Sequence, residues 1–184
     1  MTDERPDLLA ASGGPLGIAE TVLPGVAFVV AYTVSGQDTG VSAVVAVAVA
    51  AILTILRLFR RETPRHALAG LVGVVFAAFV ATRSGKAENF FLPGLLLNAA
   101  YALGCVVSVL IRRPLVGLIV PAAPQRRAAA ATWGWAGLFA LRLAVQLPLY
   151  LAGAVVALGV ARTAMGVPLF AIGIWLTYLL VRER

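Results

Sequence analysis

The sequence predicts an all-α integral membrane protein with six transmembrane helices, and three observations support this fold class. The 184-residue chain is 61% hydrophobic and 12% charged, with a mean hydropathy of +0.95, whereas about a quarter of an average soluble domain is charged. Its charges are grouped between long apolar runs, as in polytopic membrane proteins. A short block of residues also recurs in the two halves of the chain, which indicates an internal repeat.

The apolar segments define the expected elements. Residues 1–17 are polar and acidic and lack the basic start of a signal peptide, so we expect a cytoplasmic tail. Segment 112–127 carries too short an apolar run between its arginine pairs to cross a bilayer, and a short helix along the cytoplasmic interface is predicted there. The whole chain, 1–184, is then one transmembrane domain whose six spans are 18–35, 41–58, 67–82, 91–111, 136–160 and 165–181.

The distribution of basic residues predicts the orientation in the plasma membrane. With the N-terminus inside, the outer side receives only Arg83, Lys86 and Arg162. Cytoplasmic loops are enriched in Lys and Arg, so both termini are expected in the cytoplasm. The net charge of +7 then reflects topology and contact with anionic lipid headgroups, and nucleic-acid binding is not expected. The residues collected on the cytoplasmic side are Arg5, Arg57, Arg60, Arg61, Arg65, Arg112, Arg113, Arg126, Arg127, Arg182 and Arg184.

The repeated block is "LPGVAFVVAY" at 23–32 and "LPGLLLNAAY" at 92–101. The first and fourth spans run in opposite directions, so the pattern indicates a 3+3 inverted repeat of the kind known from transporters. Pro24 and Pro93 each remove a backbone hydrogen bond, and matching breaks in both halves point to a site between the halves. The alternative is a chance match in a chain rich in alanine and leucine.

A polar stripe is predicted in the fifth span, where Arg142, Gln146 and Tyr150 recur at four-residue spacing on one helix face. Trp133 and Trp135 place the start of the hydrocarbon core near residue 136, so Arg142 lies roughly 9–10 Å inside. Glu20, at a matching depth in the first span, is the expected partner. The pair either fixes helix packing or forms part of an ion pathway.

Asn98 and Tyr101 in the fourth span either hydrogen-bond across helices or line the same cavity. A metal site, a cofactor and an enzymatic activity are not expected, because His66 and Cys105 stand alone and no catalytic motif is present. The hypothetical pathway therefore consists of Glu20, Pro24, Pro93, Asn98, Tyr101, Arg142, Gln146 and Tyr150.

Four blocks carry a family resemblance: "LRLFRRETPRHALAGLVGV", "AENFFLPGLLLNAAYALGCVVSVLIRRPLVGL", "WGWAGLFALRLAVQLPLYLAG" and "GVPLFAIGIWLTYLLVRER". From about Gly13 to its end the chain resembles an actinobacterial integral-membrane family described as domain of unknown function 3159. Its proline and aromatic pattern is distantly similar to intracellular septation protein A. That second resemblance implies a role in cell-envelope maintenance and division, and neither resemblance implies a reaction.

Two functional hypotheses follow from these features. The first is a small oligomeric transporter or channel for an ion or small solute, supported by the repeat, the Pro-Gly pairs and the charges within the spans. The second is a non-catalytic membrane scaffold in envelope maintenance or division, supported by the distant septation resemblance.

Overall fold

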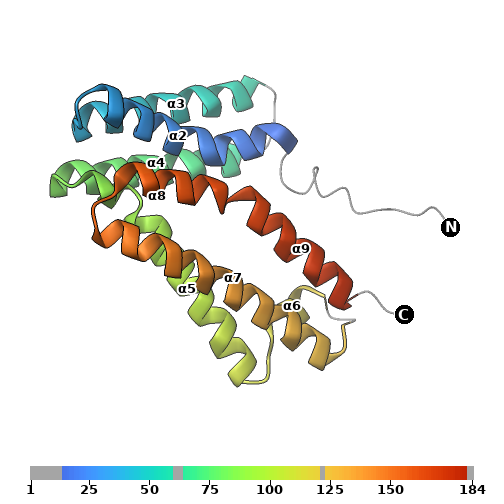
Figure 1. Cartoon of the computed structure of the whole chain (residues 1–184). Helices are drawn as coiled ribbons and strands as arrows, with labels where there is room; N and C mark the ends of the chain where they lie inside the picture. Colours follow the sequence, from blue (N-terminus) through green and yellow to red (C-terminus); the bar gives the residue numbers. More distant parts are fainter. Residues whose placement is uncertain (1–13, 60–63, 121–122, 182–184) are drawn as a thin grey trace. The chain divides into compact units, whose positions relative to one another are not determined.

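The computed structural model describes residues 14–59, 64–120 and 123–181, and the side chains of 14–21 and 64–67 lie outside this description. Within these ranges the chain forms helices and no strand (Figure 1). The elements are α2 (Gly14–Val34), α3 (Thr39–Phe59), α4 (Pro64–Ser84), the 3-10 helix η1 (Ala87–Phe90), α5 (Leu92–Leu110), α6 (Leu115–Ile119), α7 (Gln125–Leu151), α8 (Val155–Ala164) and α9 (Val167–Val181).

The chain divides into two compact units between Phe90 and Phe91. The first unit contains α2, α3, α4 and η1, and the second contains α5 to α9. Each unit has its own packing.

Small side chains form the interior of the first unit. Helix α3 packs against both α2 and α4. Small residues allow helix backbones to approach closely, which is how helices associate in a membrane, where burying apolar surface provides little driving force. The buried small residues are Ser42, Ala43, Ala46 and Ala50 on α3, and Ala77, Ala78 and Ala81 on α4.

Two local contacts stabilise the connections between helices in the first unit. Asp38 accepts a hydrogen bond from the backbone N–H of Val41 (3.0 Å), and this satisfies one of the free N–H groups at the start of α3. At the other connection, the fully buried ring of Phe28 stacks on Phe90 of η1 with centroids 4.0 Å apart. This stack holds η1 against α2.

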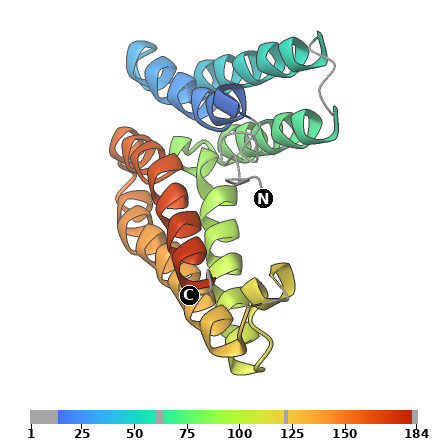
Figure 2. The same cartoon turned by 90° about the vertical axis from the view of Figure 1, so that its right-hand side faces the viewer.

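In the second unit, α5 and α7 lie antiparallel, and α6 packs against the beginning of α7 (Figures 1 and 2). The buried hydroxyl of Thr132 accepts from the N–H of Val116 (3.2 Å) and donates to the carbonyl of Ala128 (2.8 Å). Within the expected interfacial segment 112–127, the structure therefore has a five-residue helix held against α7.

The last part of the chain divides at places other than those expected. The expected span 136–160 is interrupted, since α7 ends at Leu151 and α8 begins at Val155. Gly153 has a φ of +64° in the connection, a conformation that glycine adopts readily and that commonly ends helices. A second turn, at Met165–Gly166, separates α8 from α9. Both turns consist of apolar or small residues, so the sequence shows no polar loop there.

Among the described residues, four helical stretches are long and apolar enough to cross a membrane: Thr39–Phe59, Leu92–Leu110, Gln125–Leu151 and Val155–Val181, the last comprising α8 and α9 together. Shorter apolar helices at Val22–Val34 and Leu68–Ser84 occupy the expected spans 18–35 and 67–82. The chain is therefore an all-helical membrane protein, as the composition predicts, whereas the number of six spans stays a prediction.

Trp135 joins α7 to α9. Its indole N–H donates to the hydroxyl of Thr177 (2.9 Å), and its ring meets Phe170 edge-on with centroids 5.0 Å apart. A Cβ at Gly173 would lie 2.9 Å from the indole and 3.0 Å from a methyl group of Leu138. Only glycine therefore fits at this crossing of the two helices.

Replacing Gly173 by alanine is expected to lower the free energy of unfolding by about 1–3 kcal/mol, because the added methyl group overlaps a rigid ring. The thermal midpoint of the purified protein, followed by circular dichroism in neutral detergent, measures the loss. Gly137→Ala is the matched control, since a Cβ at Gly137 meets nothing within 4 Å. Equal midpoints for the two variants would contradict this packing.

Thr132→Val is expected to cost about 1–3 kcal/mol, because the buried N–H of Val116 loses its acceptor. Faster amide hydrogen exchange at Val116 is the specific readout. Thr33→Val removes a hydroxyl that bonds only within its own helix, to Val29 (2.9 Å), and should leave exchange at Val116 unchanged. Unaltered exchange in Thr132→Val would show that this hydroxyl does not hold α6.

Candidate ion or solute site

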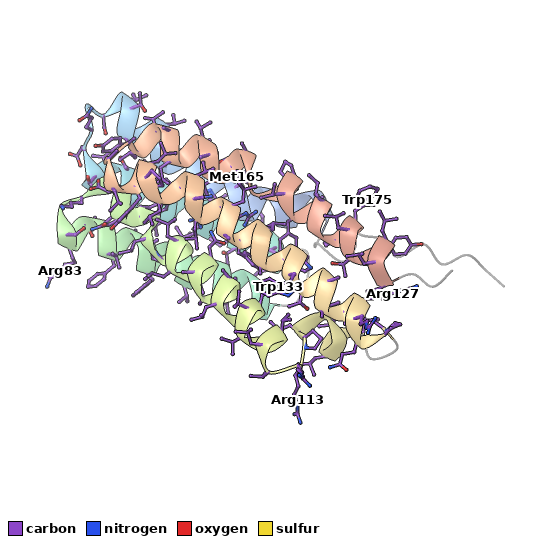
Figure 3. All side chains as sticks on the ribbon, turned by 60° about the horizontal axis from the view of Figure 1, so that its bottom comes forward. Arg83, Arg113, Arg127, Trp133, Met165 and Trp175 are labelled. Carbon is purple, nitrogen blue, oxygen red and sulfur yellow. The ribbon has the colours of Figure 1, made fainter. Side chains whose placement is uncertain are left out.

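The candidate site is built around the break between α8 and α9. Helix α8 ends at Ala164, and α9 begins at Val167 and has Pro168, which has no N–H, in its first turn. A helix end leaves carbonyl groups without their regular partners, and in a membrane these groups need another donor. Figure 3 shows Met165 at this break, away from both ends of the unit.

Arg142 on α7 supplies a donor at this break, where the carbonyl of Gly166 also accepts from the backbone N–H of Phe170 (3.2 Å). Its Nη2 group donates to the carbonyl oxygen of Met165 and to that of Gly166, the latter at 2.6 Å. The C-terminal end of a helix carries a partial negative charge, so a cation is stabilised there. Arg142 therefore connects one candidate membrane helix to the interruption in another.

The rest of the predicted stripe also faces protein. Gln146 is 2% exposed and Tyr150 is half-buried, as is Arg142. Their shared side of α7 is the side covered by neighbouring helices, while Leu147 and Leu151 on the other side are exposed. Polar groups that face the interior of a membrane bundle are typical of either packing or a pathway.

Arg162 is the second cation at the break, one helical turn before Gly166. The expected position of this residue was an outer loop, but the structure places it within α8. Its guanidinium carbon lies 5.8 Å from the centroid of the Phe91 ring, a cation–π geometry. The guanidinium also lies on the backbone of Gly94, where a Cβ would overlap it.

The two arginines have no carboxylate near them in their own unit. From Phe91 to Arg182 the sequence contains no Asp or Glu. Arg162 lies one helical turn before Gly166, whose carbonyl Arg142 contacts, and like charges in a low-dielectric environment repel. The Nε of Arg142 is buried and has no hydrogen-bond partner among the described residues. The break thus combines two positive charges with unused donor capacity.

The two repeated prolines occupy different structural positions. Pro24 is buried in the interior of α2, whereas Pro93 lies in the first turn of α5. A proline in the first turn removes no intrahelical hydrogen bond, so the expected kink at Pro93 is absent. The break that matters in the second unit lies instead at Met165–Gly166.

The remaining predicted residues lie apart from the break or outside the description. Asn98 is half-buried on α5, and Tyr101 is 54% exposed with its ring centroid 5.4 Å from that of Phe139. The side chain of Glu20 lies outside the described residues, so the expected pair with Arg142 stays a prediction.

Sequence reasoning missed Arg162 because a charge between two apolar runs was interpreted as a loop. Two signals in the sequence indicate the correct placement. Gly153 is a typical terminator after α7, and Met165-Gly166 followed by Pro168 is typical of a helix that stops and restarts. Together they define a 27-residue stretch, Val155–Val181, with one charge inside it.

An apolar groove of about 390 Å³ lies between α7 and α9, lined by Gly134, Gly137, Leu141, Gly173 and Leu176 among others. No ionisable side chain lines it, so it does not provide the chemistry of a charged site. In the part of the chain that the structure describes, no cluster of His, Cys, Asp or Glu could hold a metal ion.

The fold and the site define a helical membrane protein with a cation-bound helix break. Residues 12–184 match the family model described as "Protein of unknown function (DUF3159)". The chain therefore belongs to this family, as its four sequence blocks indicate. No curated protein and no solved structure matches the chain.

Gly94→Ala is expected to displace the Arg162 guanidinium, because the new methyl group would occupy its position. The guanidinium is the mobile end of a long side chain, so the loss of stability should stay below about 1 kcal/mol. A cysteine introduced at Arg162 by Arg162→Cys, then labelled with a cationic thiol reagent, should react more slowly when Gly94→Ala is also present. Equal labelling rates in both backgrounds would contradict the close approach.

Proposed function

We propose that the chain is a small oligomeric transporter or channel for an ion or small solute. The supporting observation is the contact between Arg142 and the carbonyls of Met165 and Gly166. Transporters commonly place their sites at discontinuous membrane helices, whose free backbone groups contact the solute or a charged side chain. A charged residue inside a membrane helix is costly to retain, which favours a functional reason for it.

The second unit supplies the parts such a site needs. Arg142 donates hydrogen bonds to two carbonyls in the turn between α8 and α9. A ligand that competes for this guanidinium therefore weakens the contact between α7 and the turn. Helix α9 is attached to α7 through Trp135 and Thr177 (2.9 Å). The start of α9 can therefore move at the break while the C-terminal half of α9, which contains Thr177, stays attached to α7.

We propose six membrane passes in two halves, with both termini in the cytoplasm. The division of the chain between Phe90 and Phe91 supports a 3+3 arrangement, with three long helices in the first unit and three helical passes in the second. In Figure 3, Arg113 and Arg127 lie toward the same end of the second unit. A basic end of this kind fits the cytoplasmic side and contact with anionic lipid headgroups.

The alternative proposal is a membrane scaffold without enzymatic activity, in line with the distant septation resemblance. The same contact favours it if the arginine only closes the helix break and fixes the packing of α7 against α8 and α9. The two proposals differ in what a folded Arg142 variant does, and flux therefore separates them.

Flux of protons, potassium and chloride through liposomes that contain the purified protein tests the proposal. Arg142→Gln is expected to reduce the flux that the wild type carries by about tenfold or more, because the break loses its charged ligand. Glu20→Gln tests the expected partner in the same preparation. Arg127→Gln is the matched control, since that arginine lies at the basic end, away from the break.

Folding of each variant is checked by circular dichroism and by size-exclusion chromatography. No flux above that of empty liposomes, with every protein folded, would refute transport and favour the scaffold. A flux that Arg142→Gln leaves unchanged would remove this residue from the pathway.

A further inference from the structure

We propose that Arg142 and Arg162 together bind one small oxyanion at the break between α8 and α9. The inference rests on the proposed function only for the claim that this anion is the transported solute. Binding itself is measurable without any flux.

The first argument is the position of the two cations. Arg142 holds the carbonyls of Met165 and Gly166, and Arg162 lies one turn earlier on α8. The guanidinium of Arg142 contacts the backbone at this break, and that of Arg162 lies against Phe91 and Gly94 at the start of α5. Two arginines from different helices thus lie at the same interruption.

The described residues of the second unit themselves supply no negative charge to these two arginines. The contacts of these two arginines include carbonyl oxygens, an aromatic face and a glycine backbone. None of them is ionised, and the sequence from Phe91 to Arg182 contains no acid. Charged groups in the membrane interior usually pair, and a bound anion would pair with both arginines at once.

The third argument is the donor geometry. Arg142 uses one terminal nitrogen on the carbonyls and leaves its buried Nε without a partner among the described residues. No hydrogen bond from the Arg162 guanidinium is formed within the described part of the chain. The planar fork of a guanidinium matches two oxygens of a phosphate, sulfate or carboxylate group. The N-terminal end of α9, next to the bound carbonyls, adds a partial positive charge.

A phosphate group can reach this site from two sources, a free anion or the headgroup of a lipid. At 1.5 Å per helical residue, Arg142 lies about 14 Å from the end of α7 at Leu151 and about 22 Å from the Arg127 position. An arginine side chain can extend toward a headgroup over part of such a distance. The experiment therefore offers the two sources separately.

The first arm measures thermal stability of the purified full-length protein in neutral detergent without phospholipid. Inorganic phosphate and sulfate should raise the midpoint by about 5 °C at saturation, compared with sodium chloride at equal ionic strength. Arg162→Gln should weaken the apparent affinity by about tenfold or more, and Arg142→Gln should do the same if it folds. Arg127→Gln should bind phosphate as the wild type does.

The second arm uses vesicles of phosphatidylglycerol and of phosphatidylcholine. Stabilisation by phosphatidylglycerol that Arg162→Gln removes, without an effect of inorganic phosphate, would support the site and identify its anion as a headgroup. Stabilisation by inorganic phosphate would support the site and identify a free anion.

Two outcomes overturn the proposal. One is a wild-type protein that none of these anions stabilises beyond chloride. The other is an Arg162→Gln variant that binds them with unchanged affinity. Failure of the proposed function is recognised separately, because phosphate binding without flux would keep the site and refute transport. Potassium flux without anion binding would keep transport and refute the site.

Discussion

The second unit depends on one interaction, the contact of a half-buried positive charge with the backbone of an interrupted helix. Arg142 donates to the carbonyls of Met165 and Gly166, and the Gly166 carbonyl also accepts from the backbone N–H of Phe170 (3.2 Å). The same contact sets how α8 and α9 lie along α7. A shorter, neutral side chain such as glutamine offers fewer donors and no charge for the end of the α8 dipole.

Composition and apolar run length predict the fold class, because bilayer thickness fixes how long a spanning helix must be. The four-residue spacing of Arg142, Gln146 and Tyr150 likewise predicts the polar stripe on α7, because it places these side chains on one helix face. The ends of α7 and α8 are not predictable in the same way. Their turns at Gly153 and Met165 contain only small or apolar residues, and hydropathy does not distinguish these from helix.

The repeated Leu-Pro-Gly block illustrates a second limit. The same three letters occur in the interior of α2 and in the first turn of α5. What separates the two cases is where the preceding helix ends, because η1 stops at Phe90 and α5 must start anew. At α5, Gly94 allows the close approach of Arg162, and this contact joins residues far apart in the sequence. No local pattern reveals such a contact.

The attachment of α9 to α7 through Trp135 has an optical consequence. The indole N–H of Trp135 is hydrogen-bonded to Thr177, while Trp133 and Trp175 are largely exposed. Indole emission shifts when its hydrogen bond breaks or its surroundings become wetter, so Trp135 is a native reporter of the α7–α9 contact. With Trp133 and Trp175 replaced by phenylalanine, the fluorescence emission of the unlabelled protein would shift in wavelength whenever these two helices separate.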